Sequence, residues 1–284
     1  MTKKVGIIGY PLDHSLSPVF QQAAFNDLNL DVIYESWPLL PKEIPYFIEN
    51  MKTQSILGVN VTIPYKEIII DYLDDIDGDA LSIGAVNTIV NTAGTLVGYN
   101  TDELGFSKTL SELMDLRLLN KSALILGSGG VARSALRTLI GNGFKNITIA
   151  NRTESRAKKL VADFVNNEAI RINTICIEDD KLSAISKSAS LIVNCTSLGM
   201  KHGESQNSSP LKYSDISKNS FVYDMVYNPI QTPLMNVANQ AGAKAFSGLS
   251  MLIYQGVESF KLWTGMEPSF EVMLKAAEEA LLID

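Results

Sequence analysis

A glycine-rich turn in the middle of the chain could bind phosphate groups. The segment Gly127-Ser128-Gly129-Gly130-Val131-Ala132 follows a short apolar run, 123–126, and leads into a stretch with helical periodicity. Gly127 allows a tight turn, Gly129 lets the backbone approach a pyrophosphate, and the helix start offers N–H groups to it. A glycine turn alone is a weak signal. A strand before it and a helix after it favour a dinucleotide site.

The residues after the next predicted strand indicate which dinucleotide binds. An NAD-binding unit usually carries an acid about 20 residues past the glycines, which contacts the ribose 2′-hydroxyl. Here the strand 147–150 leads into Asn151, Arg152 and Thr153, and Arg156 follows one turn later. Guanidinium groups bind a 2′-phosphate through charge-assisted hydrogen bonds, whereas a carboxylate would repel it. The arginines could be solvated surface charges, but their place after the strand favours NADP as the cofactor.

A lysine and an aspartate in the first half of the chain could transfer a proton. We expect Lys66 at the start of a helix over 66–73, where the helix dipole disfavours a cation. A lysine in such a place is driven toward its neutral form, which suits acid–base chemistry near neutral pH. Asp102 would orient the ammonium group. Two structural alternatives stay open: a surface lysine in a poor position, and an aspartate that only caps a helix.

Hydroxyl and amide side chains occur near the same strand ends. Ser15 and Ser17 lie at a predicted helix start, so we expect Ser17 as its N-cap, and the two hydroxyls could hold a carboxylate. Asn60, Thr62 and Asn87 offer neutral hydrogen bonds. Such groups suit a substrate rich in hydroxyls.

Strand and helix patterns alternate along the chain, which is typical of an α/β protein with mainly parallel sheets. We expect a hairpin through 91–94, with the strand 96–99 as its second arm. In the first half we predict strands over 4–8, 32–37, 59–63, 85–90 and 96–99, and helices over 18–28, 44–51, 66–73 and 103–114.

The second half contains enough strands for a complete doubly wound sheet. A linker over 116–121 leads to predicted strands over 123–126, 147–150, 172–177, 190–195, 221–225 and 244–247. Because such a sheet needs no further elements, we expect the last helices, 251–263 and 269–282, to return to the first domain. The prediction is therefore an α/β fold of two domains. Residues 1–103 with 249–284 form a substrate-binding catalytic domain, and residues 104–248 form a Rossmann domain that binds NADP.

Composition excludes several classes of function. The 284 residues suffice for two cores, and a net charge of −7 argues against a nucleic-acid partner. No apolar run is long enough for a membrane span, and the first residues lack the apolar region of a signal peptide. Cys176 and Cys195 are too few for a disulfide framework, so we expect a cytoplasmic protein. His14 and His202 stand in no metal-ligand pattern, and no metal is expected.

Eight segments together resemble the shikimate dehydrogenase family. They occur in the expected order between residue 5 and about residue 265: HSLSP, NVTIPYK, GAVNT, NTD, GSGGVARSA, NRT, DMVYNPIQTPL and GLSMLIYQG. The resemblance implies the reversible NADPH-linked reduction of 3-dehydroshikimate to shikimate, a step in the biosynthesis of chorismate and the aromatic amino acids.

The resemblance also implies roles for individual residues. The family's catalytic lysine and aspartate match Lys66 and Asp102, which contact the substrate too, and its carboxylate-binding serines match Ser15 and Ser17. Many members carry an acid near position 78 as a proposed cofactor contact, but this chain has Gly78, and that role is not carried over. Its other substrate contacts match Asn60, Thr62, Asn87, Tyr227 and Gln255. Its cofactor contacts match Gly127, Ser128, Gly129, Gly130, Val131, Asn151, Arg152, Thr153, Arg156, Thr196, Met225 and Gly248.

Three other functions stay open at this point. A quinate/shikimate dehydrogenase with broader substrate and cofactor use would tend to carry an acid where this chain has Arg152 and Thr153. A non-catalytic NADP-binding sensor would not need Lys66 and Asp102 together with a polar substrate shell. The third is an aminoshikimate-type enzyme, which the sequence alone distinguishes poorly from a shikimate dehydrogenase. The expected partner is a small molecule, shikimate or 3-dehydroshikimate. The oligomeric state is not fixed, and a homodimer is one option.

Overall fold

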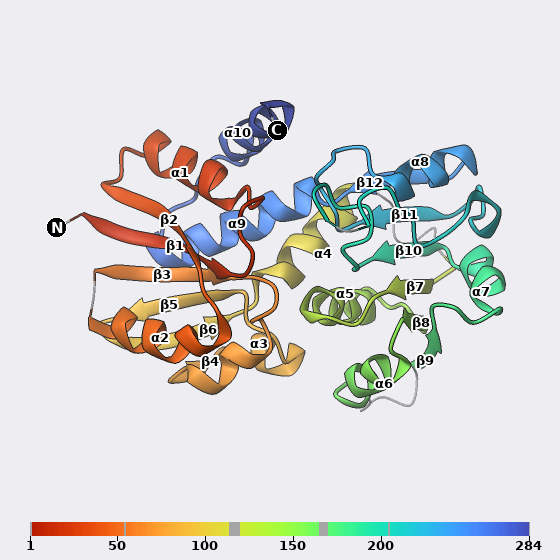
Figure 1. Ribbon diagram of the computed structural model, residues 1–284, viewed down its shortest axis with the longest axis horizontal. Coiled ribbons are helices and arrows are strands. Elements are labelled where there is room, and N and C mark those ends of the chain that lie inside the picture. The colour runs from red at the N-terminus through yellow and green to blue at the C-terminus, as the bar shows by residue number, and fades with distance from the viewer. Residues whose placement is uncertain (1, 54, 114–119, 165–169, 204, 284) are drawn as a thin grey trace. The chain divides into compact units, whose positions relative to one another are not determined.

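The chain folds into two compact units in the computed structural model (Figure 1). Unit 1 comprises Met1–Gly105 with Leu252–Asp284, and unit 2 comprises Phe106–Met251. The structure describes residues 2–53, 55–113, 120–164, 170–203 and 205–283. Two helices, α4 (Thr101–Leu113) and α9 (Leu249–Thr264), carry the chain from one unit to the other. The predicted domain boundaries, after residues 103 and 248, fall within α4 and directly before α9.

Unit 1 contains a mixed sheet in which most strands are parallel. Among its described strands the order is β2-β1-β3-β5-β6-β4, and only β5 runs against the others. The carboxyl ends of β1 and β3 therefore lie at the same edge. The strands are β1 (Lys3–Gly9), β2 (Val32–Pro38), β3 (Ile56–Val61), β4 (Asp75–Ile76), β5 (Thr88–Thr92) and β6 (Thr95–Tyr99).

Helices cover both faces of this sheet. On one face α2 (Ile44–Thr53) packs against Val59 and Val61 in an apolar cluster. Because side chains alternate along a strand, Gly58 faces the opposite side, where a Cβ would clash with Trp263 of α9. The C-terminal helices therefore return to unit 1, as predicted. The remaining described helices of unit 1 are α1 (Ser17–Asp27), α3 (Gly78–Ile83), α10 (Phe270–Ile283) and the 3₁₀ turns η1 (Pro41–Glu43) and η2 (Ile68–Tyr72).

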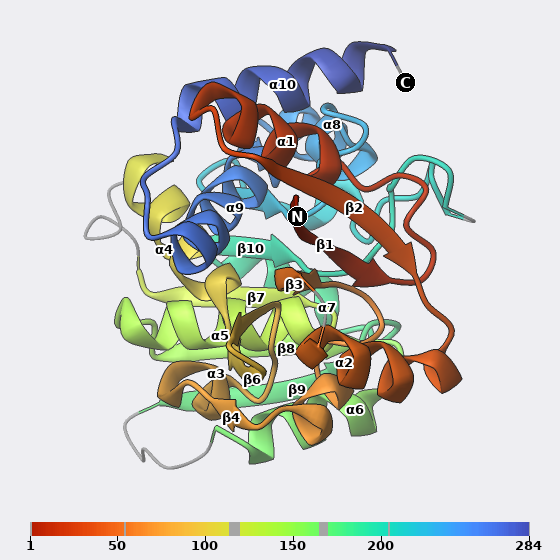
Figure 2. The ribbon, with the colours of Figure 1, turned by 90° about the vertical axis from the view of Figure 1, so that its left-hand side faces the viewer.

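The helix α10 lies along α1 (Figure 2). Phe25 of α1 contacts Phe260 of α9, with ring centroids 4.6 Å apart, and the Gln21 amide donates to the Gly256 carbonyl at 2.9 Å. Segments from the two ends of the chain thus form one core. The predicted hairpin is also present, since β5 and β6 pair across a turn in which Ala93 and Gly94 both have positive φ.

Unit 2 contains an all-parallel sheet with the order of a Rossmann fold. Its described strands are arranged β12-β11-β10-β7-β8-β9, so the order reverses between β7 and β10. In such sheets the ligand binds at the carboxyl ends of the strands beside this reversal. The strands are β7 (Ser122–Leu126), β8 (Asn146–Asn151), β9 (Arg171–Cys176), β10 (Leu191–Asn194), β11 (Phe221–Asp224) and β12 (Lys244–Ser247).

Two apolar clusters hold the layers of unit 2 together. One joins the inward side chains of α5 (Gly130–Gly141) and α6 (Glu154–Ala162) to one face of the sheet, through residues such as Leu136 and Ile147. The other joins α7 (Leu182–Ser188) and α8 (Pro233–Gln240) to the opposite face. The 3₁₀ turn η4 (Tyr213–Asp215) precedes β11. None of the described helices is both long and apolar enough to cross a membrane.

The structure differs from the predicted elements in a few places. The predicted helix over 66–73 is only the 3₁₀ turn η2, which begins at Ile68. The predicted strands 59–63 and 85–90 are displaced to β3 and β5, and the short elements β4 and α3 were not predicted. Positions 116–119 of the predicted linker and position 114, the predicted end of the α4 helix, lie outside the described residues.

Candidate active site

The glycine turn of unit 2 lies at the point where the strand order reverses. Gly127 follows β7 with a φ of +105°, a conformation that favours glycine. A Cβ on Gly127 would lie 3.2 Å from Thr196 Cγ2, so the turn packs directly against the segment that follows β10. A Cβ on Gly129 would meet nothing within 4 Å. The backbone at Gly129 is therefore open to a ligand, beside the first N–H groups of α5.

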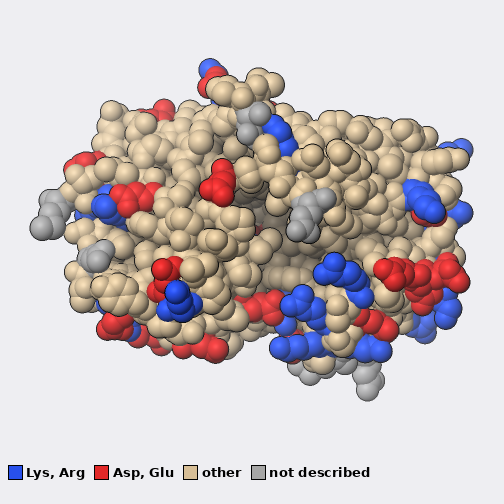
Figure 3. All heavy atoms as spheres, viewed as in Figure 1, with Lys and Arg blue, Asp and Glu red and all other residues tan. Residues whose placement is uncertain are grey.

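The segment after β8 carries the predicted arginines. Arg152 and Arg156 are exposed, and Asn151 donates to the Thr153 carbonyl at 2.8 Å, which shapes the turn before α6. The nearby acid, Glu154, forms an ion pair of 3.0 Å with Lys158. Lys and Arg side chains gather over α6 on the face drawn in Figure 3. This arrangement fits the 2′-phosphate of NADP, because no carboxylate stands at the end of β8.

Two further predicted cofactor residues come together at the ends of β11 and β12. The Gly248 amide donates to the Val226 carbonyl at 3.3 Å, and a Cβ on Gly248 would clash with the Met225 backbone. Together with the Gly127 turn and Thr196, these segments line the carboxyl edge of the sheet. The residues present therefore fit a dinucleotide along this edge.

In unit 1, Lys66 and Asp102 form an ion pair. The Lys66 Nζ lies 2.6 Å from Asp102 Oδ2, and the two side chains are 15% and 5% exposed. The helix argument for Lys66 was wrong, because Lys66 lies in the turn before η2 rather than at the start of a helix. The capping alternative for Asp102 also fails. Asn100 Oδ1 accepts the Glu103 amide at the start of α4, and the Asp102 carboxylate turns toward Lys66.

Asn87 connects the ion pair to the rest of the polar cluster. Its Nδ2 donates to Asp102 Oδ1 at 2.9 Å and lies 3.3 Å from Gln255 Oε1, and its Oδ1 accepts the Thr101 amide at 2.7 Å. The structure therefore brings the predicted residues Lys66, Asp102, Asn87 and Gln255 into one network. Both oxygens of the Asp102 carboxylate have a donor.

Asn60 lies next to this network, and both the oxygen and the nitrogen of its side-chain amide form hydrogen bonds. Its Oδ1 accepts from the Tyr34 hydroxyl at 2.8 Å, and its Nδ2 contacts Ser259 Oγ at 3.0 Å and Thr88 Oγ1 at 3.2 Å. Asn60 is buried. Its amide therefore supports the neighbouring side chains.

The serine pair lies at the start of α1, but not as predicted. The N-cap residue is Leu16, and Ser17 is the first residue of the helix. The Ser17 amide contacts Ser15 Oγ at 3.4 Å. The Ser17 side chain instead hydrogen-bonds the Tyr34 phenol, whose pKa is raised above its ordinary value by burial and lowered in part by this bond. Ser17 is thus tied to Asn60 through Tyr34.

Thr62 and Tyr227 are the remaining predicted substrate residues. Thr62 follows β3, and its amide donates to the Ile8 carbonyl at 2.9 Å, which places Thr62 at the carboxyl edge of the unit 1 sheet. Tyr227 belongs to unit 2, two residues after Met225.

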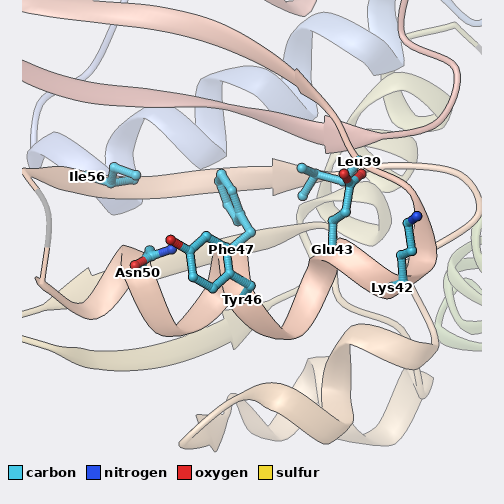
Figure 4. A pocket seen from close by; sticks show the side chains of 7 residues that line it. All are labelled: Leu39, Lys42, Glu43, Tyr46, Phe47, Asn50 and Ile56. Atoms are coloured by element: carbon cyan, nitrogen blue, oxygen red, sulfur yellow. The ribbon is translucent and has the colours of Figure 1, made fainter.

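A hollow in unit 1 contains none of the predicted residues. It has a volume of about 510 Å³ and lies against α2 (Figure 4). Its walls are mostly apolar, in contrast to the polar network around Lys66, and we assign it no chemistry. Its lining residues are Leu39, Lys42, Glu43, Tyr46, Phe47, Asn50 and Ile56. No cluster of three or more potential metal ligands occurs among the residues that the structure describes.

Several residues of the site were missed from the sequence. Tyr34 and Ser259 lie in the middle of a strand and a helix, and no local pattern marks them. Asp224, the buried last residue of β11 at the carboxyl edge of the unit 2 sheet, did carry a signal, because a carboxylate at the end of an apolar strand is costly to bury.

Comparison with known proteins accounts for the whole chain. Residues 7–89 match the model of the shikimate dehydrogenase substrate binding domain, residues 109–225 match shikimate / quinate 5-dehydrogenase, and residues 248–278 match the shikimate 5′-dehydrogenase C-terminal domain. A shikimate dehydrogenase (NADP(+)) of Halothermothrix orenii is 40% identical over 100% of this chain and 97% of its own length. The chain belongs to the shikimate dehydrogenase family.

Solved structures of the shikimate dehydrogenase family agree with this fold. A shikimate dehydrogenase crystallised in complex with NADP⁺ has a TM-score of 0.89 and 38% identity, covering 99% of this chain and 96% of that one. The Thermus thermophilus enzyme in complex with NADP(H) and shikimate has a TM-score of 0.84 and 32% identity, covering 98% and 99%. The two-domain α/β fold predicted from the sequence is confirmed.

Proposed function

We propose that this chain catalyses the reversible NADPH-dependent reduction of 3-dehydroshikimate to shikimate. The observation that carries the proposal is the Lys66–Asp102 ion pair of 2.6 Å, held within a network of buried amides and hydroxyls. Such a set combines a proton donor with neutral hydrogen-bonding groups, which a polyhydroxylated keto acid requires. The full-length match to the shikimate dehydrogenase family supports it.

Lys66 moves the proton of the reaction. Bound NADPH supplies a hydride to the C3 carbonyl carbon of 3-dehydroshikimate. The Lys66 ammonium donates a proton to the oxygen of that carbonyl as negative charge develops there. Asp102 orients the ammonium through Oδ2, while Asn87 holds Oδ1. In the oxidising direction neutral Lys66 accepts the proton from the shikimate hydroxyl.

The other side chains of unit 1 bind the substrate. Ser15 and Ser17, at the start of α1, hold the carboxylate beside the N–H groups of the helix. Thr62, Asn87 and Gln255 bind ring hydroxyls, and Asp102 also accepts from one of them. Asn60, whose amide also contacts Tyr34 and Ser259, offers a further hydrogen bond to the substrate. Tyr227 stays a predicted substrate residue, as the resemblance to the family implies.

Unit 2 binds NADP. The turn Gly127–Val131 and the start of α5 hold the pyrophosphate, and Thr196, Met225 and Gly248 contact the nicotinamide half. Arg152 and Arg156, with Asn151 and Thr153, bind the 2′-phosphate. The exposed arginines and the absence of an acid at the end of β8 support NADP over NAD.

The proposal places this chain in chorismate and aromatic amino-acid biosynthesis. Its expected location is the cytoplasm, which localisation of the tagged full-length chain would test. A homodimer stays a prediction as well, and sedimentation velocity of the purified chain would test it.

The deciding experiment compares shikimate and quinate as substrates, each with NADP⁺ and with NAD⁺, by steady-state kinetics. We expect kcat/KM to be highest for shikimate with NADP⁺. The advantage over NAD⁺ should be about tenfold to a hundredfold, as expected for charged hydrogen bonds to one phosphate. Comparable values for quinate or NAD⁺ would favour the broader quinate/shikimate enzyme. NADP⁺ binding without turnover of either acid would favour a sensor.

A further inference from the structure

A buried carboxylate stands between the strand ends of unit 2. Asp224 is the last residue of β11 and pairs in register with Asn194 of β10 on one side and Ser247 of β12 on the other. It is fully buried. The residues directly after these three strands include Thr196, Met225 and Gly248. Asp224 therefore lies where the three segments that carry these residues begin.

The Asp224 carboxylate connects these segments through hydrogen bonds. Its Oδ1 accepts from Asn194 Nδ2 at 2.8 Å and from the Val226 amide at 3.1 Å. Its Oδ2 accepts from Thr232 Oγ1 at 2.7 Å. Asn194 Oδ1 in turn accepts from the Thr196 amide and hydroxyl, at 3.1 and 2.7 Å. One side chain thus fixes both the segment after β10 and the segment after β11.

Thr232 extends the same network to the next helix. Its hydroxyl accepts the Met235 amide at 3.1 Å and is the N-cap of α8. The segment from Met225 to the start of α8 is therefore held at both ends by Asp224, through Val226 and through Thr232. Tyr227 lies within this segment.

The location of this carboxylate is costly. Burial raises the pKa of Asp224 to about 6, although three hydrogen bonds favour its charged form. A well-packed apolar residue at the end of β11 would be buried at a lower cost in free energy. The charged group is thus better explained by what it holds in place than by stability.

We propose that Asp224 is a positioning residue for the nicotinamide half of NADP, because it fixes the segments that carry Thr196, Met225 and Tyr227. The inference rests on the proposed function, which assigns these residues to the nicotinamide half and to the substrate. Asp224 acts through Asn194 and the Val226 amide. Loss of the carboxylate lets the nicotinamide ring sample orientations from which hydride transfer is slow.

The test uses the full-length protein with Asp224→Ala and the conservative variant Asp224→Asn. We expect kcat for shikimate oxidation to fall about tenfold or more in Asp224→Ala, the equivalent of one charge-assisted hydrogen bond. The primary isotope effect with shikimate deuterated at C3 should rise, because hydride transfer becomes slower. Asp224→Asn keeps an acceptor for Asn194 and Val226 but not for Thr232, so its kcat should be intermediate. The dissociation constant of 2′,5′-ADP, which lacks the nicotinamide half, should stay within about twofold of the wild-type value.

Ser220→Ala is the matched control. Ser220 is buried at the other end of β11, where its hydroxyl donates to the Ala189 carbonyl at 2.7 Å. Its removal should leave kcat and the isotope effect unchanged. The inference is overturned if Asp224→Ala keeps the wild-type kcat and isotope effect. It is also overturned if the affinity for 2′,5′-ADP falls by as large a factor as kcat, because the substitution then disturbs the whole of unit 2. If Asp224→Ala does not fold, an unchanged kcat in Asp224→Asn overturns it. Absence of shikimate turnover in the wild type would instead refute the proposed function.

Discussion

The ammonium group of Lys66 depends on the Asp102 carboxylate for its orientation. The two atoms lie 2.6 Å apart, and Asp102 is almost fully buried, so the pair is less screened by water than a surface ion pair. The Lys66 side chain is partly exposed. A variant at position 66 therefore changes two things, the proton donor and the partner of a buried carboxylate.

Two substitutions of Lys66 separate these effects. Lys66→Ala should lower kcat about 100-fold or more, the usual effect of losing a general acid. Lys66→Arg keeps a positive charge for Asp102 but does not release a proton near neutral pH, so its kcat should stay low while its stability approaches that of the wild type. Steady-state kinetics and urea unfolding measure the two properties. A variant whose KM rises while kcat survives would make Lys66 a binding residue only.

Arg152 should distinguish the two nicotinamide cofactors. Arg152→Ala should raise the KM for NADP⁺ about tenfold to a hundredfold and leave the KM for NAD⁺ almost unchanged, because only NADP⁺ carries the 2′-phosphate. Lys158→Ala is the control, since Lys158 lies on the same helix but pairs with Glu154 at 3.0 Å. Equal losses for both cofactors in Arg152→Ala would show that Arg152 supports the fold.

The buried carboxylate of Asp224 should make stability depend on pH. Burial raises its pKa to about 6 in the folded protein, so the folded state keeps this proton at pH values where the unfolded chain, with a pKa near 3.9, has lost it. Its contribution to the free energy of unfolding is therefore largest below about pH 4 and falls by roughly 3 kcal/mol as the pH rises to about 6 and above. Urea unfolding of the wild type and Asp224→Asn, from pH 4 to 7, measures the difference. A difference that does not change with pH would contradict this assignment.

At the scale of elements, apolar periodicity was a good guide and local dipole or capping rules were not. The strands of unit 2 agree with their predicted spans to within one or two residues, because several of them, such as β7 and β10, are short apolar runs bounded by polar residues. Ser17 was expected as an N-cap, but the helix begins one residue earlier and the Ser17 hydroxyl turns to Tyr34. A tertiary partner outweighed the local rule. Ser17 and Tyr34 are too far apart in the sequence for a local pattern to link them, so this contact could not be predicted.

The edge strand β2 is protected by a side chain of α1. The Gln22 amide accepts from the Tyr34 amide at 2.9 Å and donates to the Val32 carbonyl at 3.2 Å, so it occupies backbone groups that another strand could pair with. Gln22→Ala should lower the free energy of unfolding by about 1–2 kcal/mol and increase self-association. Urea unfolding and sedimentation velocity over a range of concentrations measure the two effects. Gln22→Glu keeps only the acceptor and should lie between the wild type and Gln22→Ala. A monomeric Gln22→Ala of wild-type stability would show that the edge needs no cover.

At the scale of the whole molecule, residues far apart in the chain form one network. Asn60, Asn87 and Ser259 meet within unit 1, although Ser259 follows the entire Rossmann unit in sequence. The return of the C-terminal helices was predictable, because a doubly wound sheet is complete after its sixth strand. The particular contacts of Ser259 and Tyr34 were not predictable, because they depend on the orientation of helix α9 against the sheet of unit 1. Domain organisation therefore follows from element order, and the supporting side chains require the structure.

The two units should respond separately to the two ligands. Each has its own apolar cores, and the proposed NADP-binding residues belong to unit 2. At a concentration 100 times its dissociation constant, a ligand stabilises the state that binds it by about 2.7 kcal/mol, which slows hydrogen exchange through unfolding of that state about 100-fold. NADP⁺ should therefore slow exchange most in peptides that cover 122–131 and 194–196, and shikimate should slow it most in peptides that cover 60–66 and 85–102. Mass spectrometry of exchanged peptides measures both, with 2′,5′-ADP as a control that should protect 122–131. NADP⁺ protection that is confined to unit 1 would contradict the assignment of the cofactor to unit 2.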